Sequence, residues 1–278
     1  MIYRVINLRE ADQNGFIPTL TTYVLDETLR PETPRKRPAV LICPGGGYAF
    51  CSPREAEPIA IRFNAAGYHA FVINYSVAPH VFPTAIEEVS NSLKLIRENA
   101  EKWNVDPDKI AVCGFSAGGH LTASIGTLWN TEKTIKCDDK SNKPNALILS
   151  YPVITSGEKA HRGSFDRLLG DKKDDKEMLE YLSLENRVSK DTPPTFIWHT
   201  MEDGSVPVDN SLMFANALRK NNVPFEMHIF TKGIHGLSTV DKETVSKELL
   251  DPHTAKWLSL ACEWLDNLFE TNANMIVD

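Results

Sequence analysis

The sequence predicts an α/β fold in which helices cover both faces of a mostly parallel sheet. Short runs rich in Val, Ile, Leu and Phe, typical of strands buried on both faces, alternate along the chain with segments of helical periodicity. The chain has 278 residues, which is enough to bury such a sheet. We therefore expect a single domain over residues 1–278.

The N-terminal half contains three of the predicted strands. Residues 17–25 and the apolar run AVLIC at 39–43 have the composition of strands, as do residues 68–75 (YHAFVINY). Between them, residues 54–66 carry helical periodicity and stop at Gly67, a residue type that often ends a helix. These segments predict the order strand, strand, helix, strand.

The clearest helical pattern covers residues 82–103. Pro83 lies near its start, where proline fits the first turn of a helix. Apolar side chains recur there at intervals of three or four residues, namely Ile86, Val89, Leu93, Ile96 and Ala100. A predicted strand at 109–115 and a predicted helix at 116–129 follow.

The C-terminal half continues the alternation. Predicted strands cover residues 145–153, 193–200 and 224–230, and predicted helices cover residues 208–220 and 253–269. Residues 156–192 interrupt the pattern, because they are too long for a plain crossover. Their charges alternate in sign, which favours a solvated helical excursion; the alternative is a small helical cap over a binding site.

The net charge, the N-terminal sequence and the length of the apolar stretches argue against several classes of protein. The net charge is −7, which argues against a nucleic-acid partner because phosphate contact needs a basic face. The N-terminus shows no signal-peptide pattern, and no stretch approaches the roughly 18 apolar residues that cross a bilayer. We therefore expect a cytoplasmic protein with no membrane or nucleic-acid partner.

The cysteines do not form a recognisable framework. They are odd in number, irregularly spaced and without a CxxC pair: Cys43, Cys51, Cys113, Cys137 and Cys262. This pattern predicts reduced, mostly buried thiols and no structural metal site.

The chemistry of the chain is indicated by the motif G-x-S-x-G at residues 114–118. It lies between a predicted buried strand and a predicted helix, as the strained turn of a nucleophilic serine requires. Glycines two positions before and after Ser116 allow the strand and helix to approach closely. A glycine-rich turn without chemistry would give the same letters, but the context favours Ser116 as a nucleophile.

A serine hydroxyl needs a base, and His235 is the best candidate among eight histidines. It follows the last predicted core strand between Gly233 and Gly236, at a strand's carboxyl end, where ligands of such folds bind. His199 is the rival, at the end of another strand. The others have structural interpretations: His69 and His228 in strands, His80 and His161 in loops away from strand ends, His120 packed beside the serine turn, and His253 at the start of the last helix.

The base needs a carboxylate that orients it and stabilises its cation. Asp203 follows the predicted strand at 193–200 and gives the chain order Ser, Asp, His. Glu202 and Asp209 are alternatives. Asp209 falls in the first turn of a predicted helix, where capping explains an acid, and Glu202 has the pattern of a surface charge, so we favour Asp203.

Three consecutive glycines follow the strand at 39–43, in the stretch CPGGGYAF. A hinge is disfavoured by the flanking Pro44 and Tyr48, and neither phosphate-binding glycine motif is present. Bare amides can instead approach the negative oxygen of a tetrahedral intermediate, which side chains would block. The glycines therefore predict an oxyanion hole.

Several segments together resemble one family. PGGGY, NYSVAP, FPTAIEEV, NVDPDKIAVCGFSAGGHLTAS and TPPTFIWHTMEDGSVPVDNS with GIHGL are similar to the α/β-hydrolase esterases, in particular the branch of acetylesterases and acetyl-xylan esterases. The resemblance runs from about residue 38 to about residue 269. Some members of that branch carry xylanase or sugar-hydrolase names. Such a name does not fit the residues here, since glycosidic hydrolysis normally uses two carboxylates.

The resemblance implies an α/β-hydrolase fold with a small helical cap. It implies Ser116 as nucleophile, His235 as base and Asp203 as acid, with oxyanion donors from Ala117 and from the glycine loop, namely Gly46 and Gly47. Which two amides, among those of Gly45, Gly46, Gly47 and Ala117, hold the oxyanion is left open. No cofactor or metal is implied.

The implied activity is hydrolysis of small O-acyl esters, chiefly acetyl groups on sugars or xylo-oligosaccharides. Relatives similar to hormone-sensitive lipase carry His where this chain has Pro44, and DYRLAP where it has NYSVAP, which favours the sugar-ester branch. The alternatives are an amidase, peptidase or formamidase on the same scaffold, and a non-catalytic binding protein that kept the fold.

Overall fold

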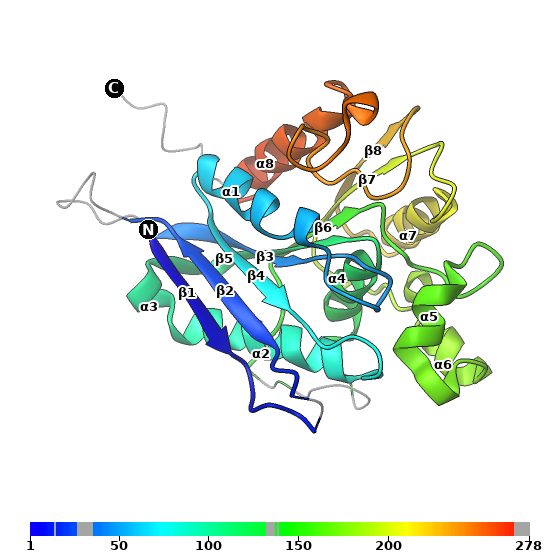
Figure 1. Cartoon of the computed structure of the whole chain (residues 1–278), viewed down its shortest axis with the longest axis horizontal. Coiled ribbons are helices and arrows are strands. Elements are labelled where there is room, and N and C mark those ends of the chain that lie inside the picture. Colours follow the sequence, from blue (N-terminus) through cyan, green and yellow to red (C-terminus); the bar gives the residue numbers. More distant parts are fainter. Residues whose placement is uncertain (14, 27–35, 132–136, 138, 270–278) are drawn as a thin grey trace.

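The computed structural model describes residues 1–13, 15–26, 36–131, 137 and 139–269. Among them, eight strands form one sheet in the order β1-β2-β4-β3-β5-β6-β7-β8 (Figure 1). The strands are β1 (Ile2–Asn7), β2 (Thr19–Val24), β3 (Arg37–Cys43), β4 (His69–Asn74), β5 (Val105–Phe115), β6 (Ala146–Ser150), β7 (Thr195–Thr200) and β8 (Phe225–Phe230). Neighbours from β4 to β8 are parallel, whereas β2 is antiparallel to both β1 and β4. The prediction of a mostly parallel sheet is confirmed.

Helices flank the sheet on both faces (Figure 1). They are α1 (Glu57–Ala65), α2 (Thr84–Glu98), α3 (Ala100–Trp103), α4 (Ala117–Leu128), α5 (Arg162–Leu169), α6 (Lys176–Tyr181), α7 (Asp209–Lys220) and α8 (Trp257–Leu268). Short 3₁₀ turns cover Pro53–Glu55, Gly170–Lys172, Leu184–Asn186, Lys247–Leu249 and Thr254–Lys256. Within the described part of the chain, no helix is long and apolar enough to cross a membrane.

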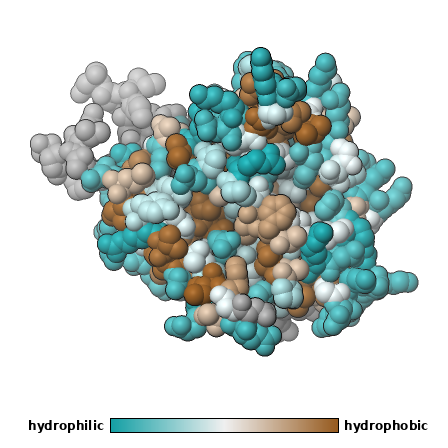
Figure 2. Space-filling model, in the orientation of Figure 1, coloured by the Kyte–Doolittle hydropathy of each residue, from teal (hydrophilic) through white to brown (hydrophobic). Residues whose placement is uncertain are grey.

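Two apolar cores lie on opposite faces of the sheet. Successive side chains of a strand point to opposite faces, so Leu41 of β3 packs with α2 and α4, whereas Ile42 packs with α1 and α8. The five apolar positions that predicted the clearest helix are all buried. On the face shown in Figure 2, hydrophobic residues form separate areas among hydrophilic ones. The apolar runs therefore serve mainly to hold the helices against the sheet.

Each predicted strand and helix is present, with three differences. Residues 82–103 form two helices, α2 and α3, which are separated at Asn99. Strand β1 was not predicted, because most of its side chains are exposed and it lies at the edge of the sheet, where burial imposes little pattern (Figure 1). The third difference concerns residues 156–192.

The segment at 156–192 is helical, as predicted, but it is not simply a solvated excursion. Phe165, Leu168 and Leu169 of α5 are buried and join the core on the α2 side of the sheet. The backbone of Phe82 donates a hydrogen bond to the Leu168 carbonyl, and Arg167 Nη1 donates to the Gly47 carbonyl. The segment is therefore fixed beside the glycine loop.

Two isoleucines on α1 test which face of this helix contributes to the stability of the fold. Ile59 is fully buried and Ile61 is 53% exposed. We expect Ile59→Ala to lower the free energy of unfolding by about 2–5 kcal/mol, because it leaves a cavity. Ile61→Ala makes the same chemical change on the solvent side, and we expect it to cost less than about 0.5 kcal/mol. Urea unfolding of both variants checks this; equal losses would contradict the assigned packing.

Candidate active site

The residues singled out by sequence lie where parallel strands end. Ser116 follows β5, Asp203 follows β7, His235 follows β8, and the glycine loop follows β3. The carboxyl ends of parallel strands share one edge of the sheet, where ligands of open α/β folds bind. The fold therefore brings residues from distant parts of the sequence to one edge.

Ser116 occupies a strained turn between β5 and α4. Its backbone has φ 53° and ψ −118°, a conformation that non-glycine residues rarely adopt. A Cβ at Gly114 would lie 2.1 Å from the Gly118 carbonyl oxygen, and a Cβ at Gly118 would lie 2.1 Å from the Cys43 carbonyl oxygen. Both flanking glycines are thus required by close packing, and the turn exposes the serine hydroxyl to its partners.

A chain of hydrogen bonds joins three of the predicted site residues. The Ser116 hydroxyl lies 2.7 Å from Nε2 of His235, and Nδ1 of His235 lies 2.6 Å from Oδ2 of Asp203. An ionised carboxylate only accepts hydrogen bonds, so Nδ1 carries the proton and Nε2 accepts from the serine. The side chain of His235 is 21% exposed, whereas that of Asp203 is fully buried.

Asp203 is held as a carboxylate by several donors. Its Oδ1 accepts from the amides of Ser205 and Val206, both at 2.9 Å, and its Oδ2 accepts from His199 and His235. Burial alone would raise the pKa of Asp203, but the hydrogen bonds from both histidines and the charge of His235 keep this pKa below its ordinary value. The residue therefore stays ionised at neutral pH.

His199, the rival base, supports Asp203 instead of contacting Ser116. Its Nε2 lies 3.2 Å from Oδ2 of Asp203 and 3.0 Å from the Val206 carbonyl, so this nitrogen is the donor. Its Nδ1 accepts from the Ser211 hydroxyl at 2.8 Å. Both ring nitrogens are used and the side chain is fully buried.

The two alternative carboxylates lie outside this chain of hydrogen bonds. Glu202 is exposed and accepts from the Gly233 amide at 3.3 Å, beside the loop that carries His235. Asp209 is the first residue of α7. In the structure, Asp203 is the one of the three that contacts His235.

The glycine loop turns its carbonyl groups toward protein donors. The carbonyls of Gly45 and Gly46 accept from the amides of Ser52 and Ala49, at 2.9 and 3.0 Å. In a trans peptide the following N–H points the opposite way. The amides of Gly46 and Gly47 therefore point away from these donors, and neither has a hydrogen-bond partner among the described residues.

The remaining amides of this region differ in availability. Gly45 donates to Oε2 of Glu55 at 2.8 Å, so its N–H is already used. Ala117 is the first residue of α4, and the first N–H groups of a helix have no partner within it. Of the four amides considered from sequence, those of Gly46, Gly47 and Ala117 have no hydrogen-bond acceptor among the residues that the structure describes.

One sequence expectation is wrong. His161 was expected away from the strand ends, but it lies at the start of α5 with its Cε1 only 3.8 Å from where a Cβ of Gly47 would be. Burial and the nearby charges of His235 and Arg167 lower its pKa. Nothing in the local sequence marks this residue, because α5 reaches the glycine loop only through tertiary packing.

His120 is buried behind the serine turn, as expected. Its Nε2 lies 3.0 Å from the Leu182 carbonyl, so this nitrogen donates, and Nδ1 accepts from the Tyr48 hydroxyl at 2.9 Å. Burial lowers the pKa of His120 to about 4. This neutral histidine ties the glycine loop, through Tyr48, to the segment that contains α6.

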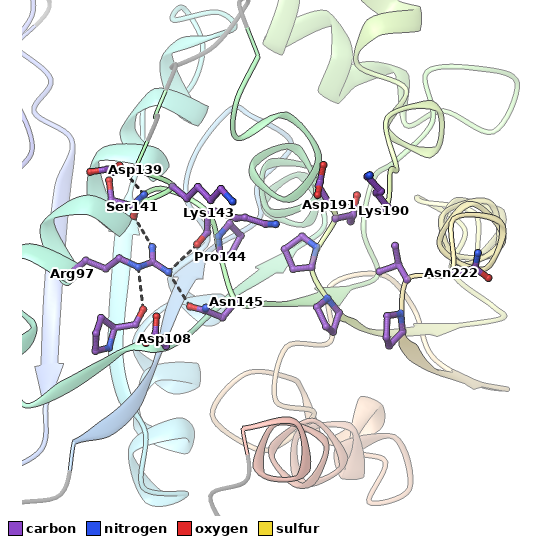
Figure 3. A pocket seen from close by; sticks show the side chains of 17 residues that line it. Arg97, Asp108, Asp139, Ser141, Lys143, Pro144, Asn145, Lys190, Asp191 and Asn222 are labelled. Carbon is purple, nitrogen blue, oxygen red and sulfur yellow. Dashed lines mark hydrogen bonds between the residues drawn. The ribbon is translucent and has the colours of Figure 1, made fainter.

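A separate hollow of about 610 Å³ lies on the other side of the sheet's strand ends, by the amino ends of β6, β7 and β8 (Figure 3). Its walls come from the segments before β6, β7 and β8, from Arg97 of α2, and from Pro107 and Asp108 of β5. Arg97 donates to the carbonyls of Pro107, Ser141 and Lys143 and to the side chain of Asn145. Its guanidinium is thus used structurally. Across the described residues, no group of three or more His, Cys, Asp or Glu side chains is placed to hold a metal ion.

Comparison with known proteins agrees with this architecture. A protein-family model described as BD-FAE matches residues 25–218. A protein named endo-1,4-beta-xylanase B, from Butyrivibrio fibrisolvens, is 42% identical over 84% of this chain and 36% of its own length. A protein named acetylxylan esterase, from Xylanibacter ruminicola, is 35% identical over 74% of this chain and 42% of its own length. The chain thus spans less than half the length of each of these two curated relatives.

Solved structures match over nearly the full chain. An acetyl ester-xyloside bifunctional hydrolase from Caldicellulosiruptor lactoaceticus is 38% identical, with a TM-score of 0.81 and coverage of 96% of both chains. A carboxylesterase from Lactobacillus plantarum WCFS1 is 30% identical, with a TM-score of 0.83, covering 96% of this chain and 98% of that chain. The predicted α/β-hydrolase fold and the resemblance to esterases are confirmed.

The buried His120 makes a pH-dependent contribution to stability. Burial lowers the pKa of His120 in the folded chain to about 4, below the ordinary 6.5. Between these two pH values the unfolded chain carries a proton on His120 that the folded chain lacks, so the folded state loses stability as the pH falls. We expect wild type to lose about 3 kcal/mol between pH 6.5 and pH 4 relative to His120→Asn, which carries no charge at either pH. Urea unfolding of both proteins across this range measures the difference; parallel pH profiles would contradict it.

Proposed function

Because this chain belongs to the BD-FAE family, we propose that it is a serine carboxylesterase that hydrolyses small O-acyl esters, chiefly acetyl groups on sugars or xylo-oligosaccharides. The observation that carries the proposal is the continuous hydrogen-bonded chain from Ser116 through His235 to Asp203. A binding role alone gives no reason for this arrangement on a strained turn.

In the proposed first step, Ser116 Oγ attacks the ester carbonyl while Nε2 of His235 takes its proton. The 2.7 Å hydrogen bond between these atoms suits direct proton transfer. Asp203 holds Nδ1–H, which fixes the tautomer of His235, and its negative charge stabilises the imidazolium that forms. Because the pKa of Asp203 is kept low, the proton stays on the imidazole.

The negative oxygen of the tetrahedral intermediate then accepts hydrogen bonds from backbone amides. We assign these to Gly46, Gly47 and Ala117, whose N–H groups have no other partner in the described chain. Such donors are fixed before the reaction begins, so they stabilise the developing charge without reorganisation. His235 next protonates the leaving alcohol, and water repeats the same steps on the acyl-serine to release the acid.

The proposal of a short acyl group rests on two observations. The related proteins from X. ruminicola and C. lactoaceticus are named for acetyl-ester hydrolysis. Pro44, in place of the His of lipase-like relatives, agrees with the same branch.

Removal of the nucleophile tests the proposed activity. We expect Ser116→Ala to lower kcat on p-nitrophenyl acetate by roughly 10⁴- to 10⁶-fold, since the remaining groups bind substrate but cannot form the acyl-serine. Ser124→Ala, a matched change on the same helix, should leave kcat near the wild-type value. Steady-state kinetics of the three proteins decide this, and a Ser116→Ala variant with wild-type turnover would refute the assignment.

The acid is tested by three amide substitutions. We expect Asp203→Asn to lower kcat by about 10⁴-fold, because the amide favours the wrong tautomer of His235. Glu202→Gln and Asp209→Asn should leave kcat near the wild-type value. If either of these lost activity while Asp203→Asn kept it, the acid would have been misassigned.

A substrate panel tests the substrate class. We expect higher kcat/KM on p-nitrophenyl acetate than on the butyrate and octanoate esters, and release of acetate from acetylated xylo-oligosaccharides. Aryl formamides, aminoacyl anilides and p-nitrophenyl xyloside should turn over far more slowly. Faster hydrolysis of an amide would favour the amidase or formamidase alternative, and faster hydrolysis of the xyloside would favour a glycosidase.

A further inference from the structure

One buried carboxylate beside the candidate active site has no part in the mechanism above. Glu55, in the 3₁₀ turn Pro53–Glu55 before α1, is only 3% exposed. Acidic side chains are rarely buried to this degree unless they are paired or hydrogen-bonded. Its two oxygens show what it does.

Each oxygen of Glu55 accepts a hydrogen bond from a different part of the site. Oε2 accepts from the Gly45 amide at 2.8 Å, and Oε1 accepts from the Tyr151 hydroxyl at 2.7 Å. Burial raises the pKa of Glu55, while these two hydrogen bonds and the charge of His235 act in the opposite direction. Both neighbours donate, so each of the two side-chain oxygens acts as an acceptor, as those of an ionised carboxylate do.

The bond to Gly45 fixes the start of the glycine loop. Gly45 packs so closely that a Cβ there would lie 2.7 Å from Oε2 of Glu55 and 3.0 Å from Cβ of Ser116. Its N–H is held by Glu55 and its carbonyl by the Ser52 amide. With both sides of the residue held, the direction of the Gly46 amide is determined.

The bond to Tyr151 reaches the loop that carries His235. Tyr151 follows β6, and its hydroxyl accepts from the Ser238 amide at 2.9 Å while donating to Glu55. Its ring meets the imidazole of His235 edge-on, with centroids 5.1 Å apart. The Ser238 hydroxyl also donates to the Arg54 carbonyl at 2.5 Å, in the same turn as Glu55. The turn is therefore joined to the His235 loop directly at Ser238 and indirectly through Tyr151.

We infer that Glu55 is a positioning residue, whose carboxylate holds the oxyanion amides and the His235 loop in register around Ser116. This inference rests on the proposed esterase function. Glu55 does not touch the reacting atoms; it acts through Gly45 on one side and through Tyr151 on the other. The oxyanion amides and His235, which stabilise the transition state, therefore depend on Glu55 more than the groups that bind the ester before the reaction.

The chain supplies its own control. Glu57, two positions along, is exposed and accepts from the Tyr23 hydroxyl at 2.9 Å, so it forms a second Glu–Tyr pair, outside the hydrogen bonds that join Gly45, Tyr151 and Ser238. Glu55→Gln and Glu57→Gln are the same chemical change, and Tyr151→Phe and Tyr23→Phe are likewise matched. At position 55, glutamine offers one acceptor and one amide donor, so one of the two original donors loses its partner.

Steady-state kinetics on p-nitrophenyl acetate test the inference. We expect Glu55→Gln to lower kcat about 10- to 100-fold with little change in KM, because a small displacement of oxyanion donors weakens transition-state binding selectively. Affinity for a boronic acid that forms a tetrahedral serine adduct should fall in parallel. Tyr151→Phe should lower kcat to a smaller extent, since the Gly45 bond remains. Glu57→Gln and Tyr23→Phe should keep wild-type kcat and boronate affinity.

The controls separate this inference from the proposed function. Inactive wild type, or an active Ser116→Ala, would refute the esterase assignment itself. An active wild type, an inactive Ser116→Ala and a Glu55→Gln variant with wild-type kcat would refute only the role of Glu55. If Glu55→Gln does not fold, Tyr151→Phe decides: unchanged kcat and boronate affinity overturn the inference, and a selective loss of both supports it.

Discussion

The candidate active site depends on how closely helix α4 approaches the ends of strands β3 and β5. A Cβ at Gly118 would lie 2.1 Å from the Cys43 carbonyl oxygen and 2.4 Å from that of Pro44, so no side chain is tolerated there. This approach places the first amide of α4 next to the loop that follows β3. It also forces Ser116 into its strained conformation, because the chain must reverse within one residue. The serine hydroxyl and the open amides thus result from one packing constraint.

A second requirement is that every charge buried at this edge of the sheet is matched by donors. Asp203 accepts from two backbone amides and two histidines, and Glu55 accepts from one amide and one hydroxyl. A buried carboxylate without such partners would be strongly destabilising, whereas a satisfied one fixes the groups around it. The two carboxylates therefore hold the loops after β3, β6, β7 and β8 in a single arrangement around His235.

The sequence predicted most of the fold because buried strands and amphipathic helices leave a strong pattern. It pointed to Ser116, Asp203 and His235 because each lies shortly after the end of a strand, so chain position alone indicates that they share one end of the sheet. It did not identify Glu55 or His161. Glu55 and Glu57 stand in the same charged stretch, and only tertiary packing makes one buried and the other exposed. Strand β1 was missed for a related reason, since its exposed side chains carry little periodicity.

The three glycines illustrate why residue type alone is weak evidence for chemistry. A Cβ at Gly45 would collide with Glu55, and a Cβ at Gly46 would lie 2.0 Å from the Phe50 carbonyl oxygen. Gly47 has φ 62° in the turn closed by the bond from Ala49 to Gly46. A loop of this shape would need the same residues without any reaction. The hydrogen bonds are more informative: the carbonyls of the loop accept from protein donors, while the amides of Gly46 and Gly47 have no acceptor among the described residues. That asymmetry, more than the absence of side chains, favours an oxyanion hole.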